Sequence, residues 1–173
     1  MNNREISRIL RSDPIVCKTF NGVFPGNFLP TSAEKKKPGF YVANTDPDHK
    51  PGEHWVAFYV PETKDHYMEY WDSYGFNPPS IFLPFLDDTY KRSAKFIQHP
   101  LSATCGQYCI FYIWRRCYGN QLEDIASTFT KDQLLNDVIV NKFIEEKFCV
   151  DLDIFDESFI NKQICKAFQI CKV

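Results

Sequence analysis

Residues 98–120 read QHPLSATCGQYCIFYIWRRCYGN, and this stretch decides the fold. From Cys105 to Tyr118 its residues are predominantly apolar, and a Gly-Asn pair then breaks the pattern. A helix that is apolar around most of its surface is normally buried. Ser102 or Thr104 can cap its N-terminus. We therefore expect one buried helix with the other elements packed around it.

Strand-like segments precede this helix in the chain. Residues 39–45 and 54–60 are rich in aromatic and β-branched side chains, and residues 65–72 are rich in tyrosine and tryptophan. The last two segments are joined by Pro-Glu-Thr-Lys at 61–64, a connection short enough for an antiparallel hairpin. Residues 94–98 predict one further short strand.

Helical patterns flank these strands. Residues 4–11 carry apolar side chains at helical spacing before an Asp-Pro pair. Residues 21–37 contain two glycines and two prolines, a composition typical of a loop. Residues 132–148 and 156–170 predict two further helices. The apolar stripe of the first of these consists of Leu134, Leu135, Val138, Ile139 and Phe143.

The layout predicts an α+β fold, with a small, mainly antiparallel sheet packed against helices around a central buried helix. A length of 173 residues fits one domain spanning residues 1–173. Hydrophobic residues make up 44% of the chain, enough to build a core. The net charge of −2 argues against a protein that mainly coats nucleic acid, because phosphate binding needs a basic field.

The seven cysteines are an odd number without any CxxC pair. This pattern favours a reduced, intracellular setting and makes a structural zinc site improbable. No stretch is long and apolar enough to span a bilayer, and the polar first ten residues are unlike a signal peptide. We expect neither a bound metal nor a membrane partner.

Cys105 stands where a loop enters the predicted buried helix. A helix N-terminus favours the thiolate, the reactive form of cysteine, through its positive dipole end and unpaired N–H groups. Gly106 follows, and its missing side chain would let a substrate backbone approach closely. Position alone leaves Cys105 equally consistent with a core residue, whereas we assign Cys109 and Cys117 to the core.

His54 and Asp72 stand at matching ends of the two hairpin strands. A catalytic thiolate needs a histidine partner, and that histidine needs an acceptor to orient it. Because the strands are antiparallel, the two side chains fall at the same open end. We interpret the other histidines, His49, His66 and His99, as surface or structural.

Gln98 lies at the end of the last predicted strand, ahead of the loop to Cys105. Its amide N–H, together with the backbone N–H of Cys105, would stabilise the negative oxygen of a tetrahedral intermediate. The alternative from position alone is an ordinary surface glutamine.

Three segments together resemble the adenovirus protease family, adenain. They read GEHWVAF at 52–58, WDSYGF at 71–76 and QHPLSATCG at 98–106. The His-Trp pair, the acid before an aromatic residue and glycine, and the glutamine seven positions before Cys-Gly match in order and approximate spacing. Related proteases occur in Maverick/Polinton transposons. The same order of His, Asp, Gln and Cys recurs more distantly in proteases that process ubiquitin-like modifiers.

The resemblance implies a papain-like or adenain-like fold whose central helix carries the nucleophile. By this resemblance Cys105 attacks the scissile carbonyl, His54 transfers the proton, Asp72 holds the imidazole and Gln98 binds the oxyanion. Trp55 would narrow the channel beside the site and favour glycine near the cut, while an ordinary core tryptophan fits equally well.

Family substrates are viral precursor proteins, cut at Gly-containing sites during particle maturation. The resemblance therefore implies a thiol endopeptidase that acts on such polypeptides in the host nucleus or cytoplasm, or in the virion. We expect it to act as a monomer.

The chain also departs from adenain. Adenain is basic and uses DNA as a cofactor, whereas the slightly acidic charge here argues against DNA stimulation. Adenain forms a disulfide with a viral peptide through a cysteine between its acid and its nucleophile, and no cysteine lies between Asp72 and Cys105. An activating peptide that adds a strand without a disulfide stays open. The sequence itself requires no cofactor.

Two other functions stay open. A protease specific for ubiquitin-like modifiers would use the same four residues. The compact size and the Phe-Pro-Gly loop at 24–26 favour the maturation protease over it. A non-catalytic binding module of the same fold is disfavoured, because all four catalytic positions are filled.

Overall fold

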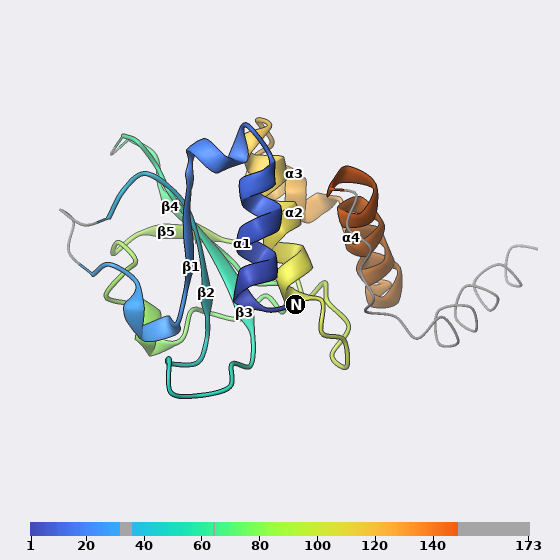
Figure 1. Ribbon diagram of the computed structural model, residues 1–173, viewed down its shortest axis with the longest axis horizontal. Coiled ribbons are helices and arrows are strands. Elements are labelled where there is room, and N and C mark those ends of the chain that lie inside the picture. The colour runs from blue at the N-terminus through green and yellow to red at the C-terminus, as the bar shows by residue number, and fades with distance from the viewer. Residues whose placement is uncertain (32–35, 64, 149–173) are drawn as a thin grey trace, which may run out of the picture.

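The computed structural model describes residues 1–31, 36–63 and 65–148 (Figure 1). The helix expected at 156–170 lies outside the described residues. In chain order the helices are α1 (Asn3–Ser12), α2 (Cys105–Cys117), α3 (Leu122–Ser127) and α4 (Gln133–Phe148). The strands are β1 (Phe20–Phe24), β2 (Gly39–Asn44), β3 (Trp55–Val60), β4 (Met68–Trp71) and β5 (Tyr90–Arg92). Short 3-10 turns occur at Val16–Lys18, Gly26–Phe28 and Ser80–Phe82.

The five strands form one mixed sheet in the order β1-β2-β3-β4-β5. The central pairs β2–β3 and β3–β4 are antiparallel, as the hairpin pattern predicts. The outer pairs β1–β2 and β4–β5 are parallel, so the expectation of a mainly antiparallel sheet holds only for the centre.

Two local predictions were wrong. The expected loop at 21–37 contains all of β1 except Phe20, and the pairing of β1 with β2 shifts register between Phe20 and Gly22. Gly22 has a φ of 141°, and a glycine inside a strand commonly marks such an irregularity. The expected strand at 94–98 does not pair in the sheet. Instead, the backbone N–H groups of Ile97 and Gln98 donate to the carbonyl of Ser73, at 2.9 and 3.1 Å.

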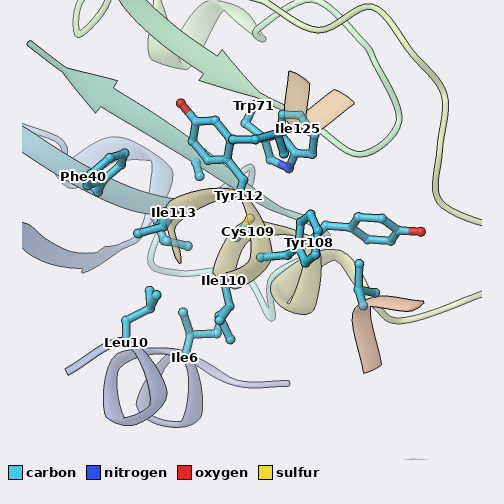
Figure 2. Packing of buried hydrophobic residues seen from close by; sticks show 14 of the residues in the cluster. Ile6, Leu10, Phe40, Trp71, Tyr108, Cys109, Ile110, Tyr112, Ile113 and Ile125 are labelled. Carbon is cyan, nitrogen blue, oxygen red and sulfur yellow. The ribbon is translucent and has the colours of Figure 1, made fainter. Parts of the chain in front are cut away.

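Helix α2 is the buried centre of the molecule, as predicted (Figure 1). Figure 2 shows side chains of α2 pointing both toward the sheet and toward α1. On the sheet side, Tyr112 stacks on Trp71 of β4, with ring centroids 4.9 Å apart and an interplanar angle of 8°. On the other side, Ile110 lies near Ile6 and Leu10 of α1 in the same buried cluster.

The opposite face of the sheet has its own aromatic cover. Phe58 of β3 and Tyr70 of β4 pack against Phe82 and Phe85, which lie in and after the 3-10 turn at Ser80–Phe82. The sheet is therefore buried on both faces, by α1 and α2 on one side and by this segment on the other. Such burial accounts for the nearly continuous apolar sequence of the central strands.

The predicted apolar stripe of α4 is confirmed only in part, because Ile139 and Phe143 pack against the core while its first two members do not. Leu134 and Leu135 of the predicted stripe are 37% and 47% exposed. The buried residues of α4 are instead Asn136, Asp137, Val140, Asn141 and Ile144. The polar members of this set bond to residues 97–108, which explains how they can be buried. No helix among the described residues is long and apolar enough to cross a bilayer.

Replacing Ile110 by alanine should test the packing around α2. Ile110 is fully buried, so the substitution should lower the free energy of unfolding by about 2–5 kcal/mol through lost burial and a residual cavity. Ile15→Ala is the matched control, because Ile15 is 43% exposed. Denaturant unfolding of both variants measures the difference, and equal small effects would contradict the burial of α2.

Candidate active site

The β3–β4 hairpin brings His54 and Asp72 together. His54 immediately precedes β3 and Asp72 immediately follows β4, so both lie at one end of the antiparallel pair. The distance from His54 Nε2 to Asp72 Oδ1 is 2.7 Å. Their side chains are only 12% and 3% exposed, which strengthens the interaction between an imidazolium and a carboxylate.

A tight turn after β4 holds Asp72 in place. The backbone N–H of Gly75 donates to the Asp72 carbonyl at 2.9 Å, and the N–H of Tyr74 donates to Asp72 Oδ1 at 2.8 Å. Gly75 has a φ of 67°, and a Cβ at this position would lie 2.7 Å from the carbonyl oxygen of Ala94. Glycine is therefore required here both by backbone conformation and by space. The turn fixes the carboxylate before any substrate arrives.

Cys105 is the first residue of α2 and is 8% exposed. The His54 side chain and the backbone N–H groups of Trp55 and Gly106 lie near enough to its sulfur to lower the pKa of the thiol. Because His54 Nε2 faces Asp72, Nδ1 is the ring nitrogen that remains for the sulfur. The structure thus brings together three side chains that lie far apart in sequence.

The contacts shift both titrating groups toward an ion pair. Burial alone would lower the pKa of His54, but hydrogen bonds and charge from Asp72 and Cys105 outweigh it and raise the pKa to about 9. Burial likewise opposes ionisation of Cys105, but the hydrogen bond and positive charge of His54, aided by two backbone N–H groups, lower the pKa of the thiol. A thiolate beside an imidazolium is the form expected near neutral pH.

Gln98 lies next to this group but is fully buried, which excludes the surface alternative. Its Oε1 accepts from the Ser73 hydroxyl at 2.6 Å. Its Nε2 donates to the Tyr74 hydroxyl at 3.2 Å and to the carbonyl of Ser102 at 3.0 Å. Both N–H groups of this amide therefore already have acceptors within the protein.

The two expected substrate-contacting residues differ in their surroundings. Trp55 is half-buried beside His54 and donates from Nε1 to the Met1 carbonyl at 3.1 Å. Gly106 is buried, and a Cβ on it would lie 3.2 Å from Ile6 Cδ1 of α1. The space left by its missing side chain is thus filled by α1, contrary to the expectation that a substrate backbone would use it.

The predicted helix cap was also wrong. Thr104 occupies the N-cap position of α2 but makes no side-chain capping bond there. Its hydroxyl donates instead to Asp137 of α4 at 3.0 Å, and the Tyr108 hydroxyl donates to the same oxygen at 2.9 Å. The first N–H groups of α2 consequently remain free to face negative charge at Cys105.

Two neighbours of the site were missed from the sequence. Tyr74 stacks on the His54 ring at 4.7 Å with an interplanar angle of 26°. Its position two residues after Asp72 was the available signal. Asp137, whose pKa is raised by burial, anchors the loop before Cys105 from a helix 33 positions away from Thr104. No local pattern connects it to the site.

Comparison with known proteins points to viral cysteine proteases. No family model matches the chain. The cysteine protease S273R of African swine fever virus, isolate Tick/Malawi/Lil 20-1/1983, is 31% identical over 105 residues. The SUMO-1 cysteine protease S273R of isolate Pig/Kenya/KEN-50/1950 is 30% identical over the same length. Each match covers 53% of this chain and 38% of the viral protein, so well under half of either relative is matched.

The fold is shared with a solved structure. The crystal structure of the selenomethionine form of the pS273R protease of African swine fever virus superposes with a TM-score of 0.54 at 20% identity. The match covers 81% of this chain and 66% of that chain. At this identity the comparison shows a common α+β fold.

The ion pair predicts an unusual alkylation profile for Cys105. Its rate of reaction with iodoacetamide should stay high at pH values below ~8.5, the ordinary pKa of a thiol, because His54 lowers the pKa of the Cys105 thiol. His54→Ala should move the profile to higher pH. Peptide mass spectrometry follows each cysteine separately. Cys117, whose pKa burial raises, is the internal control, and equal profiles for the two would contradict the ion pair.

The charge of Asp72 can be tested without an enzymatic assay. Asp72→Asn keeps the size of the side chain but removes its charge, so the pKa of His54 should fall below its value of about 9. An NMR titration of the histidine ring protons measures this pKa. Asp88→Asn, at an exposed position, is the control. An unchanged titration in Asp72→Asn would show that the carboxylate does not hold the imidazolium.

Proposed function

We propose that this chain is a cysteine endopeptidase in which Cys105 is the nucleophile, His54 the base and Asp72 the orienting acid. The observation that carries the proposal is the convergence of these three side chains at one end of the β3–β4 hairpin, with a shifted pKa on both members of the Cys–His pair. The similarity to viral proteins named cysteine proteases supports it.

The chemistry follows from the contacts. The thiolate of Cys105 attacks the scissile carbonyl, and the carbonyl oxygen becomes the oxyanion of a tetrahedral intermediate. The intermediate collapses as His54 Nδ1–H gives its proton to the leaving amine, which leaves a thioester on Cys105. His54 then takes a proton from water, the hydroxide attacks the thioester, and collapse of the second tetrahedral intermediate releases the carboxylic acid product and the Cys105 thiolate, which restores the ion pair. Asp72 holds Nε2 throughout and stabilises the imidazolium.

Stabilisation of the oxyanion falls to groups around the start of α2. The backbone N–H of Cys105 lies in the uncapped first turn, where the dipole favours negative charge. The adenain resemblance assigns the side-chain contribution to Gln98. Trp55, beside His54, is our candidate for the wall that favours small residues near the cut.

We propose viral or virus-like precursor proteins, cut at Gly-containing sites during particle maturation, as the substrates. The related proteins are viral, and the adenain resemblance points to the same substrate class. A second candidate is a ubiquitin-like modifier or its conjugate. The name of one relative, a SUMO-1 cysteine protease, favours this candidate specifically.

The remaining properties are proposals of the same kind. The domain would span residues 1–173 and act as a monomer on protein substrates, without a metal and without DNA. An activating peptide that pairs with a sheet edge stays compatible with the fold, because β1 and β5 are edge strands. The enzyme would act inside the host cell, in the nucleus or cytoplasm, or in the virion.

Cleavage-site profiling with purified protein tests activity and specificity together. The wild-type chain should cut proteome-derived peptides at Gly-containing sites, and Cys105→Ala should lower turnover by several orders of magnitude while retaining the fold. Cys17→Ala is the matched control, since Cys17 lies outside the site. Full activity in Cys105→Ala would end the proposal.

The same purified protein can be used to distinguish between the two candidate substrate classes, by comparing its cleavage rates on each. Rapid release of SUMO-1 from a C-terminal adduct, with slow cutting of Gly-containing precursor peptides, would favour the modifier protease. The reverse order of rates would favour the maturation protease.

A further inference from the structure

The Gln98 amide is in a poor position to donate directly to an oxyanion. It is fully buried, and its Nε2 already donates to the Tyr74 hydroxyl and the Ser102 carbonyl. Its Oε1 is held by the Ser73 hydroxyl at 2.6 Å, which prevents the amide from turning over. A direct contact with substrate would require one of these bonds to break in a buried environment, where unpaired polar groups are costly.

Tyr74 contacts both the base and this amide. The ring of Tyr74 stacks on the imidazole of His54, and its hydroxyl oxygen accepts from Gln98 Nε2 at 3.2 Å. Its backbone N–H is bonded to Asp72, so the residue is fixed at both ends. Tyr74 is only half-buried, and within the described parts of the chain its own hydroxyl hydrogen has no acceptor.

We propose that the Tyr74 hydroxyl is the side-chain donor to the oxyanion, and that Gln98 is a positioning residue that acts through it. The inference rests on the proposed function. It replaces the direct contact from Gln98 by a relay, in which the amide N–H donates to the hydroxyl oxygen and the O–H donates to the substrate oxygen.

The physical chemistry of the relay is favourable. A hydroxyl that accepts one hydrogen bond becomes a better donor of its own, because successive bonds polarise one another. Burial raises the pKa of Tyr74, with added effects of nearby negative charges at Cys105, Asp137 and Asp72, so the phenol keeps its proton at neutral pH. No proton is transferred. The turn after β4 places the donor in advance, and such preorganisation is what makes oxyanion donors effective.

Tyr74→Phe is the direct test. It keeps the ring that stacks on His54 and removes only the hydroxyl. Turnover of a peptide substrate should fall by about 10²-fold, the usual effect of losing one oxyanion donor. The rate at which iodoacetamide alkylates Cys105 should not change, because that reaction uses the thiolate but forms no oxyanion. Tyr67→Phe, at a position 53% exposed, is the matched control for both assays.

The two assays separate the roles that a tyrosine could play here. A purely structural role would lower alkylation and turnover together, and that result would overturn the proposal. Unchanged turnover in Tyr74→Phe would also overturn it. Loss of the fold, judged by a thermal melt, would do the same, since it would assign the hydroxyl to stability.

Combining Tyr74→Phe with Gln98→Ala tests the relay itself. If Gln98 acts through Tyr74, the double variant should be no slower than Tyr74→Phe alone, because the second change removes a partner of a group already absent. Multiplying effects would show that Gln98 donates independently and would overturn the relay. An inactive wild-type protein would contradict both the proposed protease function and this inference. An active wild type with an equally active Tyr74→Phe variant would contradict this inference alone.

Discussion

Burial of α2 between the sheet and α1 is the constraint on which the rest of the molecule depends. Two contacts hold the helix against β4. Tyr112 stacks on Trp71, and Arg116 forms a bidentate salt bridge with Glu69, with both bonds at 2.9 Å. Because a helix is rigid, fixing its body also fixes its first residue. Cys105 therefore stands at the end of the sheet where the β3–β4 hairpin presents its histidine and carboxylate.

A second layer of order comes from polar groups that must find partners once they are buried. Asp137 and Asn136 of α4 bond to Thr104, to Tyr108 and to the carbonyl of Ile97. These bonds attach both ends of the loop between Gln98 and Cys105 to α4. The cost of leaving any of these groups unpaired makes the arrangement specific, so a helix distant in sequence shapes the entrance to the nucleophile.

Electrostatics then converts this geometry into reactivity. Neither an isolated buried thiol nor an isolated buried imidazole favours its charged form, because burial penalises charge on both. When the two groups are adjacent, the imidazolium and the thiolate stabilise each other. Asp72 adds to the stabilisation of the imidazolium, and backbone N–H groups add to that of the thiolate. The pair is useful only because the hairpin and the helix meet at the same place.

Local pattern by itself determined the α+β class, helices α1, α2 and α4, the central hairpin, and the approach of His54 to Asp72, because apolar periodicity and antiparallel pairing are properties of short stretches. It predicted a loop where β1 forms and missed the buried polar residues of α4, because the pairing of an irregular strand and the burial of polar side chains depend on partners from elsewhere in the chain. Tertiary structure alone decided that the Gln98 amide has three polar partners, that Gly106 makes room for α1, and that Tyr74 contacts both the base and the amide. Each of these depends on side chains from separate segments meeting in space, which spacing along the chain does not encode.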